Sequence, residues 1–191
     1  MKQFDWETFY RFTNDSPPWP LIVRAVSLLP HKGRALDLGA GAGRDTRYLV
    51  QQGFQVTAVD SDPHAVDILG SFQEGNVQVV QASFEEFAFE TYDLINAQFA
   101  LPFVSQRWFR EVFARVKRAL NPGGMFVGQF FGIHDQWNTP EHDMTFLTRE
   151  QAEAFLQDLD IIELKEEDMD GHIADGSPKH WHTFHIIARR P

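Results

Sequence analysis

The sequence contains no cysteine among its 191 residues, which excludes disulfide bonds, thiolate catalysis and thiolate metal sites. It has no apolar run that approaches the roughly 20 residues needed for a membrane-spanning helix. Residues 1–7 lack the long apolar segment that a secretory signal contains. These absences predict a cytoplasmic protein without a membrane partner.

Basic residues are also scarce. The chain has 17 lysines and arginines and 27 acidic residues, which gives a formal net charge of −10. Proteins whose main partner is a nucleic acid usually carry a basic surface, so the composition argues against such a partner. The length is typical of a single domain that covers residues 1–191. The sequence leaves the oligomeric state open.

What the sequence does contain is a glycine-rich turn. Residues 35–46 read as an apolar strand, a turn with Gly39, Gly41 and Gly43, and the start of a helix. Glycine tolerates a positive φ and lets a ligand approach the backbone. The N-terminus of the following helix offers free N–H groups and the positive end of its dipole. The pattern therefore predicts a cradle for a negatively charged or carboxylate-bearing ligand.

A carboxylate, Asp60, ends the next apolar strand, which is predicted at residues 54–60. In nucleotide-binding sheets an acid at this place accepts hydrogen bonds from ribose hydroxyls. The glycines, the helix and this acid together predict a nucleotide-type ligand. A dinucleotide fingerprint needs a glycine at position 44, where this chain has Arg44, so the pattern disfavours a nicotinamide dinucleotide.

Apolar and amphipathic segments alternate along the rest of the chain. After the strand of the glycine turn, strands are predicted at residues 54–60, 77–81, 92–99, 125–131, 161–167 and 180–188. Helices are predicted at residues 5–12, 21–29, 44–52, 63–73, 105–120 and 148–158. Alternation predicts an α/β fold with a parallel, doubly wound sheet. The last two strands have no helix between them and should pair antiparallel, giving seven strands in all.

In order and spacing, these motifs resemble class I S-adenosylmethionine-dependent methyltransferases. The resemblance is carried by LDLGAGAG at 36–43, VD at 59–60, QASF at 81–84, YDLI at 92–95 and LNPGG at 120–124. The compact size and residues 43–49 are similar to small-molecule enzymes of the tellurite-resistance and thiopurine type. The resemblance implies a Rossmann-like sheet in one methyltransferase domain, with residues 1–30 as a helical cap and 31–191 as the cofactor-binding core.

The resemblance also implies roles for single residues toward S-adenosyl-L-methionine. Asp37 would hold the ammonium group, the backbone carbonyl of Asn96 would face it, and Asp60 would take the ribose hydroxyls. The implied cofactor-binding residues are Asp37, Gly39, Ala40, Gly41, Gly43, Asp60, Ser61, Ser83, Phe84, Asn96 and Gln98.

The implied activity is methyl transfer to a small-molecule acceptor. Trp19, Phe99, Leu101 and Trp137 are the predicted acceptor-lining residues, and their aromatic character favours an apolar or aromatic acceptor. A non-catalytic cofactor-binding module with a blocked acceptor cavity is one alternative. A nicotinamide-dependent oxidoreductase is another.

The candidate general base is His134, in the loop predicted at residues 134–147, because the unperturbed pKa of histidine lies near neutrality. A solvated loop histidine is the alternative. Loops beyond the carboxyl ends of parallel strands often carry function.

No metal site is predicted from the C-terminal histidines. On a strand, His180 and His182 share one face and His185 points to the other, so one regular strand cannot direct all three at one ion. A structural or substrate-lining role is favoured for them, and Trp181 is predicted to lie in the core. The acids within residues 163–167 are typical of a solvated surface.

Overall fold

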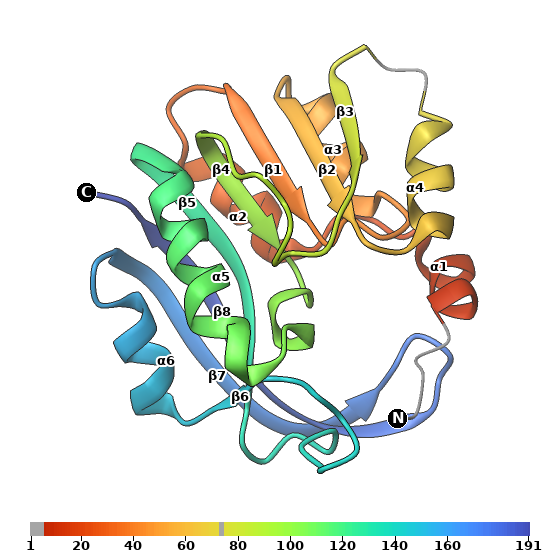
Figure 1. Cartoon of the computed structure of the whole chain (residues 1–191), viewed down its shortest axis with the longest axis vertical. Helices are drawn as coiled ribbons and strands as arrows, with labels where there is room; N and C mark the ends of the chain where they lie inside the picture. Colours follow the sequence, from red (N-terminus) through yellow and green to blue (C-terminus); the bar gives the residue numbers. More distant parts are fainter. Residues whose placement is uncertain (1–5, 73–74) are drawn as a thin grey trace.

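The computed structural model describes residues 6–72 and 75–191. Its helical elements are α1 (Trp6–Thr13), α2 (Pro20–Leu28), α3 (Arg44–Gln51), α4 (Pro63–Gly70), the 3-10 turn η1 (Leu101–Phe103), α5 (Gln106–Ala119) and α6 (Arg149–Leu156). Its strands are β1 (Arg34–Leu38), β2 (Gln55–Asp60), β3 (Val77–Gln81), β4 (Tyr92–Ala97), β5 (Leu120–Gly132), β6 (Phe146–Leu147), β7 (Asp160–His172) and β8 (Pro178–Arg189) (Figure 1).

The strands form one mixed sheet in the order β3-β2-β1-β4-β5-β8-β7. Strands β1 to β5 pair parallel, whereas β8 runs antiparallel between β5 and β7. The predicted doubly wound sheet with a C-terminal antiparallel hairpin is therefore confirmed. The predicted number of seven strands was one short, because β6 pairs with β5 inside the loop expected at 134–147. Two residues are too few to show a strand period in the sequence.

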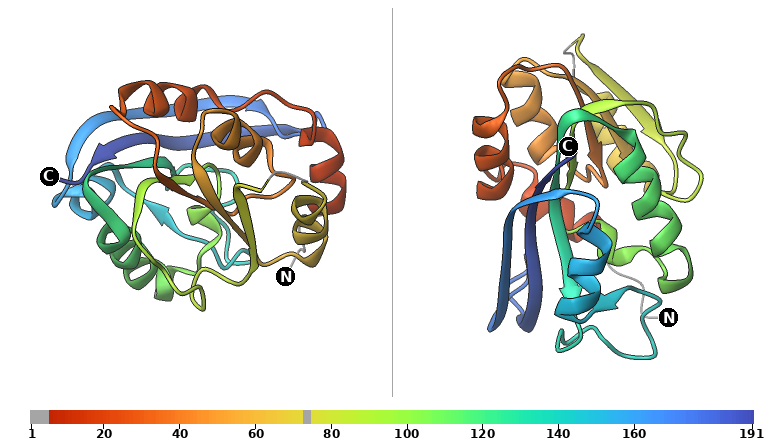
Figure 2. Two further views of the ribbon diagram at one scale, coloured as in Figure 1. Left: turned by 90° about the horizontal axis from the view of Figure 1, so that it is seen from above. Right: turned by 90° about the vertical axis from the view of Figure 1, so that its left-hand side faces the viewer.

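Helices cover both faces of the sheet (Figure 2). Helices α2 and α3 pack on one face, with Met125 and Val127 of β5 pointing toward them. Helices α5 and α6 pack on the other face, which receives Phe126 and Phe130 from the same strand. A strand covered on both sides buries successive residues, which explains why β5 reads as a nearly continuous apolar run.

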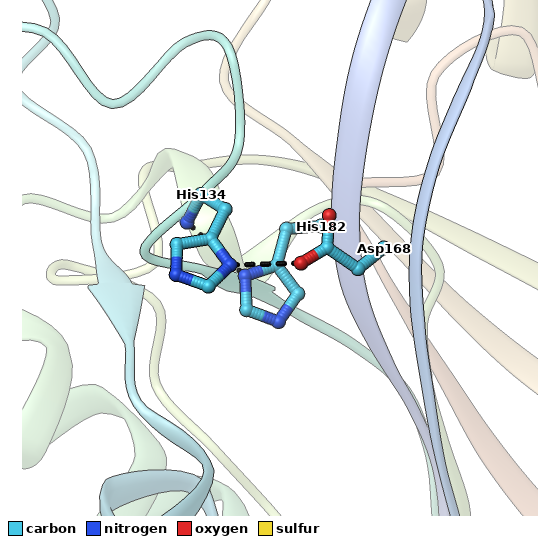
Figure 3. Close-up of side chains that lie close together, drawn as sticks. All are labelled: His134, Asp168 and His182. Carbon is cyan, nitrogen blue, oxygen red and sulfur yellow. Dashed lines mark hydrogen bonds and ion pairs between the residues drawn. The ribbon is translucent and has the colours of Figure 1, made fainter.

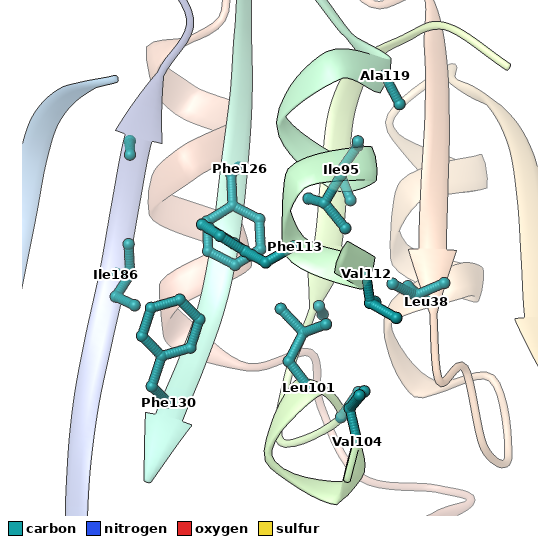
Figure 4. Packing of buried hydrophobic residues seen from close by; sticks show 14 of the residues in the cluster. Leu38, Ile95, Leu101, Val104, Val112, Phe113, Ala119, Phe126, Phe130 and Ile186 are labelled. Atoms are coloured by element: carbon teal, nitrogen blue, oxygen red, sulfur yellow. The ribbon is translucent and has the colours of Figure 1, made fainter. Parts of the chain in front are cut away.

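The larger part of the core lies under α5 (Figure 4). Phe109 and Phe113 are buried at the helical spacing that predicted this helix. The ring of Phe113 lies 5.2 Å from that of Phe126, edge to face. Helix α6 begins with the expected capping box, in which Thr148 and Gln151 exchange hydrogen bonds.

The C-terminal hairpin is much longer than predicted. Strands β7 and β8 extend to His172 and Pro178, so most of residues 168–179 is paired strand rather than connection. The hairpin reaches beyond the sheet toward α1, as Figure 1 shows. Its outer part is held by backbone hydrogen bonds, and exposed side chains such as Asp168 and Asp170 give no apolar alternation.

Other bounds differ by a few residues. Strand β5 begins at Leu120, because Gly123 and Gly124 bond through their backbone to Arg190 instead of stopping the chain. Strand β4 ends at Ala97, two residues earlier than predicted. The predicted helix ends at positions 5 and 73 lie outside the described residues.

Candidate active site

The strand order reverses between β1 and β4, where Asp37 lies opposite Asn96. In open α/β sheets, ligands bind in the crevice beyond the carboxyl ends of the strands at such a reversal. A cavity of about 950 Å³ lies here. Its walls come from α1, the glycine turn, the ends of β2 and β4, and the β7–β8 hairpin.

The glycine turn has the backbone that its sequence predicts. Gly39, Gly41 and Gly43 all have positive φ, at 77°, 53° and 77°. The N–H of Gly41 donates to Oδ2 of Asp60 over 2.8 Å, and burial raises the pKa of this carboxyl. A side chain at Gly43 would lie 2.5 Å from the ring of Phe72, so Gly43 lets α4 pack closely against the turn.

Two buried carboxylates, Asp37 and Asp45, share one amide at the base of the cavity. Nδ2 of Asn96 donates to Asp37 over 2.9 Å and to Asp45 over 3.1 Å. Burial, reinforced by the charge of Asp45, raises the pKa of Asp37 to about 7. Burial also raises the pKa of Asp45. Such a pair favours a cation arriving in the cavity, since the cation would compensate the buried negative charge.

The guanidinium of Arg44 lines the same cavity as these carboxylates. Arg44, the first residue of α3, lines the cavity and stacks on Trp19, 4.4 Å from the ring. Burial lowers the pKa of Arg44. Its Nε is buried and has no hydrogen-bond partner in the described part of the chain. A donor of this kind is costly to leave unpaired, so Arg44 offers a position for an incoming anion.

One wall of the cavity is aromatic. Phe99 has a left-handed φ of 49°, and its ring lies 4.8 Å from Trp19 and 5.8 Å from Trp181. Trp137 completes this wall, with its ring 5.6 Å from that of Trp181. A strained backbone held within a ligand cavity is typical of functional sites.

The structure brings most of the predicted site residues together. The predicted residues that do line the cavity are Asp37, Gly39, Ala40, Gly41, Asp60, Ser61, Ser83, Phe84, Asn96, Gln98, Trp19, Phe99 and Trp137. Three predicted residues lie elsewhere. Gly43 faces α4, as described, and Leu101 is fully buried in the core under α5. The third, His134, does not line the cavity.

His134 belongs to a cluster with Asp168 and His182 (Figure 3), and none of these three residues lines the cavity. Its Nδ1 lies 2.8 Å from Asp168, and its backbone N–H donates to Nδ1 of His182 over 3.1 Å. Ligand atoms of these three residues lie within 4.8 Å of one another. Nε2 of His182 contacts Glu166 at 2.9 Å, so both nitrogens of that ring already have partners. The cluster joins the loop after β5 to the hairpin.

Some residues of the site were missed in the sequence. Trp181 was predicted to lie in the core, and the acids of 163–167 were read as solvated, yet Trp181 and Glu167 line the cavity. The available signal was strand alternation, which places Trp181 on the same face as His185. Arg44 and Asp45 belong to residues 43–49, which carry the narrower resemblance, but neither was predicted to bind the cofactor, since an acid in a helix's first turn also satisfies the helix dipole.

Comparison with known proteins agrees with this geometry. The family model of the methyltransferase domain matches residues 35–124, which hold the glycine turn, Asp60 and Asn96.

An uncharacterized methyltransferase of Mycobacterium tuberculosis is 31% identical over 140 residues, 71% of this chain and 52% of that protein. A carboxy-S-adenosyl-L-methionine synthase of Ectopseudomonas mendocina is 30% identical over 132 residues, 58% of this chain and 52% of that protein. The chain thus spans about half the length of these curated relatives.

Solved structures share the fold over most of this chain. TehB from Haemophilus influenzae superposes with a TM-score of 0.77 at 20% identity, covering 89% of this chain and 61% of TehB. The 1,6-didemethyltoxoflavin-N1-methyltransferase of Burkholderia thailandensis, solved with S-adenosylhomocysteine, superposes with a TM-score of 0.69 at 22% identity. The superposition covers 97% of this chain and 85% of that protein. Within residues 6–72 and 75–191, no helix has the length and apolar character to cross a membrane.

Proposed function

We propose that the protein transfers a methyl group from S-adenosyl-L-methionine to a small-molecule acceptor. The observation that carries the proposal is a single cavity with two unlike halves. One half presents Asp37, Asp45, Arg44 and Asp60, and the other presents aromatic side chains. The volume of about 950 Å³ lies at the upper end of ordinary ligand sites, which supports two ligands held side by side.

The polar half fits the cofactor. Asp37 and Asp45 suit its ammonium group, and the unpartnered Nε of Arg44 suits its carboxylate. Asp60 suits the ribose hydroxyls, while Ser83 and Phe84 suit the adenine. When bound, the sulfonium supplies an electrophilic methyl group and a good leaving group. The task left to the chain is to align the acceptor with that methyl group and exclude water.

The aromatic half supports an enzyme over a non-catalytic module, because it leaves room for an acceptor beside the cofactor. In this proposal residues 1–30 cap a single domain, and Trp6 and Tyr10 of α1 line the cavity accordingly. The Burkholderia neighbour, a methyltransferase solved with 1,6-didemethyltoxoflavin, supports a small molecule as acceptor.

The test is calorimetric titration with S-adenosylhomocysteine, followed by a methyl-transfer assay across phenols, amines, thiols and metalloids. We expect S-adenosylhomocysteine to bind and nicotinamide dinucleotides to leave the protein unaffected. Mass spectrometry of the nucleoside product separates methyl transfer from synthesis of carboxy-S-adenosyl-L-methionine. Failure of S-adenosylhomocysteine to bind would overturn the proposal.

A further inference from the structure

We propose that His185 is the general base of the reaction, oriented by Glu167, and that the acceptor is a flat aromatic compound with an ionisable O–H or ring N–H. This inference rests on the proposed function and names the substrate class of the same cavity.

The position of His185 follows from strand alternation on β8. Trp181, Thr183 and His185 point into the cavity, whereas His180 and His182 point to the other face. The side chain of His185 is 20% exposed, and its ring lies 6.5 Å from that of Phe99. His185 therefore lies in the aromatic half, where the acceptor must bind.

A chain of side-chain amides fixes which nitrogen of His185 is the base. Oε1 of Gln129 accepts the backbone N–H of Phe99 over 2.8 Å, which sets the orientation of this amide. Its Nε2 is therefore the donor, and it contacts Oε1 of Gln98 at 2.7 Å and Nδ1 of His185 at 3.4 Å. A donor facing Nδ1 requires that Nδ1 carry a lone pair.

The hydrogen bonds of Asn96, at the proposed ammonium site, impose the same orientation on the amide of Gln129. Nδ2 of Asn96 donates to the carboxylates Asp37 and Asp45, so its Oδ1 accepts from Nε2 of Gln98 over 3.1 Å. Oε1 of Gln98 is then the acceptor for Gln129. The cofactor's ammonium site and the proposed base are thus joined by one continuous set of hydrogen bonds.

Glu167 holds the opposite nitrogen of the ring. Its Oε2 lies 3.2 Å from Nε2 of His185, so the neutral imidazole donates its N–H to this carboxylate. A carboxylate behind a histidine orients the ring and stabilises the imidazolium that forms when the other nitrogen takes a proton. The contact of 3.4 Å to Gln129 is long and therefore weak, so an acceptor O–H that reached Nδ1 could displace the amide as the partner of its lone pair.

The surrounding charges suit this role. Burial lowers the pKa of His185, which keeps the ring neutral and able to accept a proton near pH 7. The hydrogen bond from Lys165 lowers the pKa of Glu167, which keeps it ionised. Among the described residues, the charged groups that act on His185 are Glu163, Lys165 and Glu167, all on β7. Its neighbours on other elements are uncharged, namely Gln129 of β5 and Phe99, which follows β4.

The shape of the wall selects a flat ring. Phe131 and Trp137 lie 5.8 and 5.6 Å from Trp181, centroid to centroid, and these three rings pack around Nζ of Lys179, which is 3.5 Å from the Trp181 centroid. Phe99, 5.8 Å from Trp181, carries the aromatic surface on toward His185. Aromatic walls favour stacked or edge-on rings. The nearby cation Lys179 is buried and bonded to Asp135, so it is not offered to an anionic acceptor.

The reaction balances without another reactant. The acceptor oxygen or nitrogen forms a bond to the methyl carbon, and the carbon–sulfur bond breaks with its electron pair on sulfur. The acceptor's proton passes to Nδ1 of His185, giving an imidazolium beside Glu167, and then leaves to water.

The test uses two chromophoric phenols of different size, 4-nitrophenol and 7-hydroxy-4-methylcoumarin, with the full chain saturated by S-adenosylhomocysteine. Both change their absorption on losing a proton. At a pH near the pKa of the free phenols, we expect at least one to bind the wild-type protein with a larger phenolate fraction than it has in solution. His185→Gln should bind it without this increase, and the matched control His180→Gln, on the opposite face of β8, should behave like wild type.

The same increase in phenolate fraction in His185→Gln would overturn the role of the histidine. Absence of binding by either phenol at millimolar concentration would overturn the acceptor class. Loss of S-adenosylhomocysteine binding by the wild-type protein would instead overturn the proposed function.

A second measurement does not depend on whether the variant folds. In wild-type protein labelled with ¹⁵N-histidine, we expect His185 to be the Nε2–H tautomer at neutral pH. The Nδ1–H tautomer would contradict the proposal, since the lone pair would then face Glu167 instead of the acceptor.

Discussion

The backbone N–H of Gly41 donates a 2.8 Å hydrogen bond to Oδ2 of Asp60 and thereby joins the glycine turn to the end of β2. The other oxygen of Asp60 accepts from the N–H of Asp62 over 3.0 Å. The carboxylate is thus held in place before any ligand arrives. A group positioned in advance loses less conformational freedom on binding, which makes Asp60 an effective partner for ribose hydroxyls.

Replacing Asp60 by alanine should remove measurable S-adenosylhomocysteine binding. Two hydrogen bonds to a charged group contribute about 1.5–3 kcal/mol each, so a loss of at least about 100-fold in affinity is expected. Calorimetry measures it, with Asp67→Asn on the exposed side of α4 as the control. Unchanged affinity in Asp60→Ala would contradict the assignment of the site.

Binding of S-adenosylhomocysteine should strengthen as the pH rises toward neutrality. Asp37 has a pKa of about 7 in the folded protein because of burial and the charge of Asp45, so below that pH it holds a proton that an ammonium ligand must displace. Affinity should rise by up to about tenfold per pH unit below pH 7 and level off above it. Calorimetry in buffers of different ionisation enthalpy should detect proton release.

The same group predicts a pH dependence of stability without ligand. The folded pKa of Asp37 lies above the ordinary 3.8, so the folded state retains a proton that the unfolded chain has lost. This contribution to stability is present below about pH 4 and is lost as the pH rises to about 7. Urea unfolding across this range should show a smaller decline in Asp37→Asn. An identical decline in both proteins would exclude Asp37 as its source.

Arg44 should recognise the carboxylate of the cofactor's amino-acid part. Arg44→Gln should lower the affinity for S-adenosylhomocysteine by about ten- to a hundredfold, since a hydrogen-bonded ion pair is lost. Affinity for 5′-methylthioadenosine, which lacks the amino acid, should hardly change. Arg107→Gln, an exposed substitution on α5, is the control. Equal losses for both ligands would show that Arg44 acts only through folding.

The buried ion pair of Lys179 and Asp135 should stabilise the loop behind the cavity. Nζ of Lys179 lies 2.6 Å from both carboxylate oxygens, and the two side chains are 2% and 0% exposed. Lys179→Met leaves a buried carboxylate without its cation, which costs about 3–5 kcal/mol. For a domain of this size that corresponds to a fall in Tm of about 6–20 °C.

Thermal unfolding followed by circular dichroism measures this effect. The control is Asp158→Asn, which removes the exposed partner of Lys117 and should cost less than about 1 kcal/mol. A Tm for Lys179→Met within a degree of wild type would contradict this role and show that the backbone N–H groups of Trp137 and His182 suffice to hold Asp135.

Local features of the sequence were enough to predict which polar residues gather at one end of the cavity. A positive φ at Gly39 and Gly41 and the carboxylate at the end of β2 are properties of a few adjacent residues. Parallel strands bring their carboxyl ends to one edge, so Asp37, Asp60 and Asn96 could be placed together without coordinates. The alternation of strands and helices in turn predicted the doubly wound sheet.

Tertiary structure alone decided which histidine lines the cavity. The sequence predicted His134 as the base and a structural or substrate-lining role for His185, but in the folded chain only His185 lines the cavity, because the long β7–β8 hairpin forms one of its walls. The hairpin's outer half is held by backbone pairing and carries exposed polar side chains, which leave no periodic signal. Local chemistry therefore specified the part of the cavity formed by the glycine turn and Asp60, whereas contacts between segments far apart in the chain specified the part formed by the hairpin.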